Sequence, residues 1–112
     1  MKGRPRRGDV YWVALGPARG TEMRKTRPAV IVSNDSCNTH GARVVVVPIT
    51  SNVSSLYPGE ARITVGGKPA RALGDQVRSV DKVRVRSRLA RLSPEAMHDV
   101  EVAVRVTLDL RS

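Results

Sequence analysis

The sequence predicts a small, mainly β protein of the α+β class, in which a compact, curled antiparallel sheet or small barrel precedes one C-terminal helix. Short apolar or alternating runs, separated by glycine and proline turn signals, predict strands along most of the chain. The spacing becomes helical only after Ser93. The 112 residues contain no internal repeat or linker. We therefore expect one domain over residues 1–112, with residues 1–7 as a flexible basic arm.

Three apolar segments in the first half of the chain predict strands. Residues 8–15 are apolar on both faces, and residues 28–35 form a short run that is too apolar to face solvent. We expect Pro28 to open its strand, because proline donates no ladder hydrogen bond. Residues 42–50 predict a third strand, in which Pro48 indicates an edge or a bulge near the end. Between the first two strands, residues 16–27 predict a glycine-containing loop.

The second half predicts a hairpin and a basic strand. Residues 51–60 predict a loop or a single helical turn, and the pair Gly66 and Gly67 predicts a tight turn between two strands. Residues 74–82 are rich in turn formers and predict a connector. In residues 83–92, period-two alternation predicts a strand with a basic outer face. This alternation sets Val83, Val85, Ser87 and Leu89 against Arg84, Arg86 and Arg88.

The C-terminal segment has the signals of a helix that packs on the sheet. Ser93 is a favourable N-cap, and Pro94 occupies the first helical position. An apolar stripe at helical spacing follows, formed by Met97, Val100, Val104 and Leu108.

The charge balance points to a polyanionic partner. Twenty basic and ten acidic residues give a net charge of +10, and the pI is near 11.2. Most of the basic residues are arginine, whose planar fork donates two parallel hydrogen bonds to phosphate. Nucleic acid is the favoured partner. The alternatives are a basic surface that only aids solubility and one that meets an acidic protein.

Several classes of function lack their sequence signals. Cys37 is the only cysteine, so no intramolecular disulfide is possible, and we expect a structural role for it. No apolar stretch approaches the ~18 residues of a membrane span, and we expect a cytoplasmic protein. His40 and His98 have no ligand-spaced partners, and no phosphate-binding glycine motif occurs. We therefore expect no metal and no cofactor.

One loop concentrates the residues that RNA cleavage needs. Glu22 lies beside Arg24, Lys25 and Arg27. The 2′-hydroxyl of RNA can attack its own phosphorus, so the first step needs only a proton acceptor, a proton donor and groups that stabilise the charged phosphorane. DNA lacks this hydroxyl. From spacing alone, a solvated basic turn with Glu22 as an internal ion-pair partner is the simpler interpretation.

A set of motifs resembles a known family. "RGDVYWVAL", "TRPAVIVSND", "VVVVPIT", "LGDQVRSVDK" and "SPEAMHDVEVAVRVTLDL" occur in order from Arg7 towards the C-terminus. Together they resemble the MazF/PemK family of bacterial toxin endoribonucleases. The resemblance implies a homodimer of small SH3-like barrels, each with a C-terminal helix. It also implies metal-independent cleavage of single-stranded RNA at a short sequence, with 2′,3′-cyclic phosphate and 5′-hydroxyl ends, and an acidic antitoxin that occupies the RNA groove.

The resemblance assigns roles to individual residues. Arg27 corresponds to the family's catalytic arginine and Thr50 to its catalytic threonine, while Glu22 corresponds to a glutamate that contributes to catalysis in some members. We expect Arg27 to stabilise the phosphorane or donate to the leaving oxygen, and Thr50 to donate to a non-bridging oxygen. The expected RNA-binding residues are Trp12, Arg24, Lys25, Asn34, Ser51, Gln76 and Arg78. Thr50 could instead cap the next loop, and Trp12 could instead belong to the core.

Two other classes of function remain open. A CcdB-type toxin has the same fold but poisons gyrase and cuts no nucleic acid. A basic SH3-like RNA-binding module would not require the pair Arg27 and Thr50. The arginines at positions 84, 86 and 88 could attract RNA or antitoxin, or could form only a solvated strand face.

Overall fold

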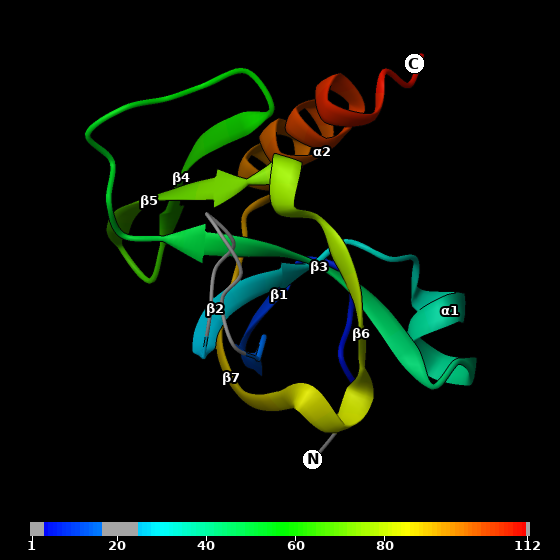
Figure 1. Ribbon diagram of the computed structural model, residues 1–112. Coiled ribbons are helices and arrows are strands. Elements are labelled where there is room, and N and C mark those ends of the chain that lie inside the picture. The colour runs from blue at the N-terminus through cyan, green and yellow to red at the C-terminus, as the bar shows by residue number, and fades with distance from the viewer. Residues whose placement is uncertain (1–3, 17–24, 112) are drawn as a thin grey trace.

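The computed structural model describes residues 4–16 and 25–111 and forms one curled antiparallel sheet with a helix against it (Figure 1). The strands are β1 (Asp9–Ala14), β2 (Thr26–Ile31), β3 (Arg43–Thr50), β4 (Glu60–Val65), β5 (Lys68–Leu73), β6 (Arg78–Asp81) and β7 (Val85–Arg91). The helices are α1 (Asp35–His40) and α2 (Pro94–Leu108), with the short 3-10 turns η1 (Gly74–Gln76) and η2 (Lys82–Arg84). The predicted fold class is confirmed.

Strand β3 connects the two parts of the sheet. Its middle pairs with β2, which pairs in turn with β1 and β7, and its first half also pairs with β6. Its last two residues, Ile49 and Thr50, pair with β5 of the β4–β5 hairpin. Pro48 lies where β3 passes from one set of partners to the other. The predicted edge or bulge at Pro48 is wrong, because β3 is a central strand and its pairings with β2 and β5 run without a register shift.

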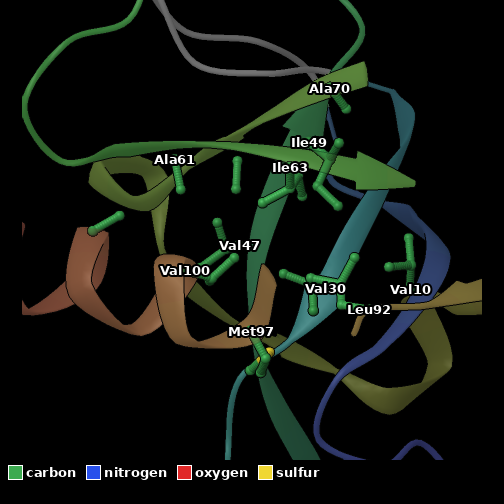
Figure 2. Close-up of a cluster of buried hydrophobic side chains, with 12 residues drawn as sticks. Val10, Val30, Val47, Ile49, Ala61, Ile63, Ala70, Leu92, Met97 and Val100 are labelled. Carbon is green, nitrogen blue, oxygen red and sulfur yellow. The ribbon is translucent and has the colours of Figure 1, made fainter. Parts of the chain in front are cut away.

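The sheet buries aliphatic side chains on both faces, which explains why β1 and β2 have no polar side. Figure 2 shows the cluster that lies between the sheet and α2. It includes Val47 and Ile63 from the strands, and Met97 and Val100 from the helix. The second cluster fills the inside of the curl with Tyr11, Val13, Leu15, Ala29, Ile31, Val44, Val46, Val80 and Val85.

Helix α2 begins and packs as its sequence predicts. The Ser93 hydroxyl oxygen accepts a hydrogen bond from the Ala96 amide, and Pro94 is the first helical residue. The face that packs on the sheet buries Met97, Val100 and Ala103. Leu108, at the end of the predicted apolar stripe, is half exposed. The stripe is therefore not buried over its whole length.

The hairpin of β4 and β5 is a tight and regular turn. Six cross-strand pairs connect the two strands, from Glu60 opposite Leu73 to Val65 opposite Lys68. Gly66 and Gly67 have φ angles of 57° and 81°. Positive φ at both central residues is the mark of a type I′ turn, which matches the twist of the strands and is costly for other residue types. The predicted hairpin is confirmed, and its tip holds a defined position.

Three predicted details of the chain are wrong. Pro28 lies inside β2 opposite Trp12 and does not open the strand; it is tolerated because the β2–β3 pairing ends at Ala29 and leaves one of its edges without a ladder. The connector contains strand β6, which pairs with β3. Helix α1 was not predicted; Asn34 caps it by accepting a hydrogen bond from the Cys37 amide.

The basic strand is also shorter than its alternation suggests. Val83 lies in η2 and is 79% exposed, and Leu89 is 44% exposed. Register shifts between β1 and β7 interrupt the period-two pattern, so parity in the sequence no longer decides which side chains are buried. Val85 alone of the four predicted inner residues is buried.

The described part of the predicted basic arm contacts the body of the protein. Pro5 is buried, and the Arg7 guanidinium donates to the Val32 carbonyl and forms an ion pair with Glu101 on α2. Residues 1–3 lie outside the described part of the chain, so the single domain with a flexible arm over residues 1–7 stays a prediction. No helix in the described part of the chain is long and apolar enough to cross a membrane.

Candidate nucleic-acid cleft

A cleft of about 530 Å³ opens where β3 leaves β2 and joins the β4–β5 hairpin. Its wall on the side of β1, β2 and β7 is formed by Trp12, Arg27, Pro28 and Leu89. The end of β3 contributes Ile49, Thr50 and Ser51, and the hairpin contributes Val65, Gly66, Lys68, Pro69 and Ala70. The surface is therefore mostly apolar, with a few basic and hydroxyl side chains.

Arg27 and Thr50 meet in this cleft because of the register of their strands. The last β2–β3 pair is Ala29 with Pro48. Continuing an antiparallel register by two residues on each strand brings Arg27 level with Thr50. Since alternate residues of a strand share a face, both side chains leave their strands on the same face. Both residues line the cleft, so two predicted catalytic residues are brought together.

The Thr50 hydroxyl has a structural contact and a free proton. Its oxygen accepts a hydrogen bond of 3.2 Å from the Asn52 amide, so Thr50 does cap the following loop. A hydroxyl that accepts one hydrogen bond can still donate its own proton. The side chain is half buried, and the neighbouring Ser51 is exposed and lines the same cleft. Capping therefore orients the Thr50 hydroxyl without using its donor.

Arg27 presents its guanidinium to solvent at the cleft. The side chain is exposed, and no acceptor in the described part of the chain binds it. Its five N–H donors can make two parallel hydrogen bonds to a phosphate. Its backbone position is fixed by pairing with Val13 of β1. An exposed arginine on a paired strand, with no partner among residues 4–16 and 25–111, is well suited to bind an anion.

Trp12 belongs to the cleft more than to the core. It is 37% exposed and lines the cleft, whereas its neighbours Tyr11 and Val13 are buried inside the curl. Leu89, 44% exposed, lines the same wall. An exposed indole beside an aliphatic side chain offers a flat apolar surface of the kind that stacks on nucleic-acid bases.

Four other predicted RNA-binding residues are not among the described lining residues: Lys25, Asn34, Gln76 and Arg78. Asn34 caps α1, and Arg78 at the start of β6 donates to the Gln76 carbonyl at 3.4 Å. Lys25 is exposed, and its backbone bonds to Leu15 and Gly16 at the base of the first loop. Their roles in binding RNA stay predictions. Glu22 and Arg24 lie outside the described residues.

Sequence reasoning missed the contribution of the hairpin. Lys68, Val65 and Pro69 line the cleft, and Lys68 is its second basic residue. The only available signal was a lysine directly after the glycine pair, and the sequence does not show where the hairpin tip lies relative to β2. No carboxylate is found among the described lining residues. The described part of the lining is therefore cationic and favours an anionic ligand.

Metal-ligating residues do not gather within residues 4–16 and 25–111, where no group of three or more histidine, cysteine, aspartate or glutamate side chains could hold an ion. His40 and His98 are both exposed, on α1 and α2 respectively. The surface position predicted for His98 is confirmed. Cys37 is exposed on α1.

The protein is a small curled barrel whose cleft contains an arginine and a threonine. Comparison with known proteins identifies the family to which it belongs. Residues 6–108 match the family of PemK-like, MazF-like toxins of type II toxin–antitoxin systems. The chain belongs to this family.

Individual relatives are similar to this chain in sequence or in structure over nearly its whole length. The chain is 36% identical over 116 residues to endoribonuclease MazF9 of Mycobacterium tuberculosis. The aligned region covers 96% of this chain and 98% of that protein. It resembles the crystal structure of MazF from Deinococcus radiodurans with a TM-score of 0.84 at 25% identity, over 96% and 99% of the two chains. It also resembles a mycobacterial endoribonuclease in complex with its cognate antitoxin, with a TM-score of 0.80 at 26% identity, over 96% and 98% of the two chains.

Proposed function

We infer that this protein is the toxin of a type II toxin–antitoxin system and acts as an endoribonuclease on single-stranded RNA. Membership of the family and the 36% identity to a protein named an endoribonuclease support the activity. The observation that carries the proposal for the site is that Arg27 and Thr50, from different strands, line one cationic cleft. Cleavage of messenger RNA would stop translation and growth.

In the proposed reaction the RNA supplies its own nucleophile. The 2′-oxygen attacks the adjacent phosphorus, the bond from phosphorus to the 5′-oxygen breaks, and a 2′,3′-cyclic phosphate and a 5′-hydroxyl result. The 2′-proton passes to a base, and the leaving 5′-oxygen gains a proton. The extra negative charge on the phosphorane is the charge that the protein must stabilise, and this is where preformed donors contribute most.

Arg27 and Thr50 are the proposed donors. A guanidinium has donors and no acceptor, so Arg27 is suited to hold the phosphorane oxygens or to donate to the leaving oxygen. The Thr50 hydroxyl, oriented by the Asn52 amide, is suited to donate to a non-bridging oxygen. Glu22 is the candidate for receiving the 2′-proton.

The proposed partners follow from the charge of the cleft and from the family. An acidic antitoxin segment would compete with RNA for Arg27 and the rest of the cationic cleft, and one structurally similar endoribonuclease was solved in complex with its cognate antitoxin. We also propose a homodimer, as the family resemblance implies. Light scattering of the purified protein would give about twice the chain mass of 12.2 kDa for a dimer.

One assay tests the activity. A long single-stranded RNA is incubated with the purified protein in EDTA, and the ends of the products are mapped. We expect discrete cuts with 5′-hydroxyl ends, and we expect Arg27→Ala to lose them. Intact RNA across a wide range of sequences would refute the endoribonuclease and leave the gyrase-poisoning toxin or the RNA-binding module.

A further inference from the structure

Lys68 at the tip of the β4–β5 hairpin is the second basic residue of the cleft, and neither the resemblance nor the comparisons give it a role. It comes from β5, across the cleft from the strand that carries Arg27. Its neighbours Pro69 and Ala70 line the cleft as well, so the start of β5 borders the cleft at Lys68.

Lys68 differs from the other basic residues of its hairpin in having no described acceptor. Arg71 donates to Ser55 and forms an ion pair with Glu60, and Arg62 donates to the Val53 carbonyl. No acceptor within residues 4–16 and 25–111 binds the Lys68 ammonium, and the side chain is exposed. A lysine with no acceptor in the described part of the chain can give its charge to a ligand.

The hairpin gives this charge a defined position. Lys68 pairs with Val65 directly beside the type I′ turn, and Pro69 follows it. A fixed φ at proline and a paired neighbour on the other strand restrict the backbone at Lys68. The cation is therefore presented by a rigid element, as a binding residue should be.

The cleft offers room for more than the reacting phosphate. Arg27 and Thr50 lie level on β2 and β3, while Lys68 stands on the hairpin, with the apolar side chains of Trp12 and Leu89 on the opposite wall. A cleft that is lined by two cations and by apolar side chains can take both the phosphates and the bases of a single strand. We propose that Lys68 binds a phosphate that flanks the scissile one and so fixes the register of the RNA in the cleft. This proposal rests on the proposed function.

A salt titration tests the contact without requiring turnover. Lys68→Gln is compared with Lys82→Gln, which removes the same charge from η2, outside the cleft. The probe is a single-stranded RNA of mixed sequence. For single strands the slope of log affinity against log salt is negative, and each lost phosphate contact decreases its magnitude by about 0.7. We expect this decrease for Lys68→Gln only. Equal slopes for the two variants would overturn the proposal, whether or not the protein cleaves RNA.

A double-mutant cycle locates the phosphate. The RNA carries a 2′-deoxy nucleotide at the cleaved position, and one phosphate at a time is replaced by a neutral methylphosphonate. We expect one flanking substitution to weaken binding to the wild type about tenfold, as for one charged hydrogen bond, and to leave Lys68→Gln binding almost unchanged. Coupling to a flanking phosphate on either side supports the proposal. Coupling to the scissile phosphate, or to none, overturns it.

Failure of this proposal and failure of the proposed function give different results. If the wild type cuts RNA but Lys68 shows no coupling to a flanking phosphate, the endoribonuclease activity is supported and the Lys68 contact is refuted. The wild type could instead cut no RNA while the magnitude of the salt slope still decreases for Lys68→Gln alone. In that case Lys68 contacts RNA and the endoribonuclease activity is refuted. In an active enzyme, we expect Lys68→Gln to raise KM and to leave kcat within about twofold of the wild type.

Discussion

Thr50 and Arg71 face each other across the β3–β5 ladder, and the Arg71 side chain holds the loop that begins after Thr50. Its Nη1 donates to the carbonyl and the hydroxyl of Ser55. Its Nε lies 3.5 Å from Glu60 Oε1, in an ion pair whose side chains are 12% and 8% exposed. The loop from Ser51 to Gly59 is thus tied to the strand beside the candidate catalytic threonine.

Loss of this tie should destabilise the fold. Arg71→Met keeps much of the side-chain volume but leaves the Glu60 carboxylate nearly buried without its cation, which typically costs about 3–5 kcal/mol. Urea unfolding measures the change in free energy. The control is Arg62→Met on β4, an exposed residue with one long hydrogen bond of 3.3 Å, where we expect a cost below about 1 kcal/mol. Equal costs for the two variants would contradict the account.

The Thr50 hydroxyl should matter for catalysis more than for folding. Thr50→Val keeps the branched shape and removes the donor, so we expect kcat to fall about 10²-fold, as for loss of one transition-state donor. Thr50→Ser keeps the hydroxyl and should retain most of the activity. The exposed Asn52 amide that loses its acceptor can bond water. Single-turnover cleavage of one RNA measures all three proteins, and a valine variant as fast as the wild type would exclude the donor role.

Gly74 should not tolerate a side chain. A Cβ there would lie 2.5 Å from the Gly59 carbonyl oxygen and 3.1 Å from the Ala103 side chain on α2. The nearest atom belongs to the backbone, so Gly74→Ala must shift the loop or the helix, and we expect a loss of about 1–3 kcal/mol. Gly66→Asn is the control: its site is open and asparagine accepts the positive φ. The unfolding midpoint of Gly74→Ala should lie clearly below that of Gly66→Asn. A Gly74→Ala protein as stable as the wild type would show that the loop or the helix can move to accept the added Cβ.

Asp35 should contribute stability that acid removes. The Arg7 amide donates to its carboxylate and, as the largest cause, lowers its pKa from 3.8, with help from the Asn38 side chain. A folded pKa below the unfolded one stabilises the protein fully above pH 3.8, and this contribution is lost as the pH falls through the folded pKa. Wild type and Asp35→Asn should therefore differ in unfolding free energy at pH 6 and converge towards pH 2.5. A constant difference would contradict this origin.

Local patterns predicted those parts of the fold that depend on neighbours in sequence. The glycine pair at 66 and 67 specifies its turn by φ alone, and Ser93 with Pro94 specifies the start of α2. Strand β6 was missed because its stability comes from pairing with β3 and not from its own composition. Leu89 was misplaced because the bulged pairing of β1 with β7 cannot be read from alternation, and Val83 because it lies in η2, before β7 begins.

The candidate site also combines features that short motifs indicate with features that depend on how the strands pair. The roles of Arg27 and Thr50 were assigned by the family resemblance, which rests on short motifs near one end of β2 and of β3. Their juxtaposition depends on the β2–β3 register, and the position of Lys68 depends on where the hairpin folds back, which no local pattern encodes. Asn34 caps α1, a contact that the sequence did not predict, and its role in binding RNA stays a prediction.

The central claim is that the cleft of Arg27 and Thr50 cleaves RNA through the 2′-hydroxyl of the substrate. The most direct measurement compares two RNAs that differ only by a 2′-deoxy sugar at the mapped cut, each incubated with the wild-type protein in EDTA. We predict that the ribose substrate is cut to a 2′,3′-cyclic phosphate and a 5′-hydroxyl, and that the 2′-deoxy substrate binds with similar affinity and stays intact at that position. Cleavage of the deoxy substrate at the same bond would contradict the account.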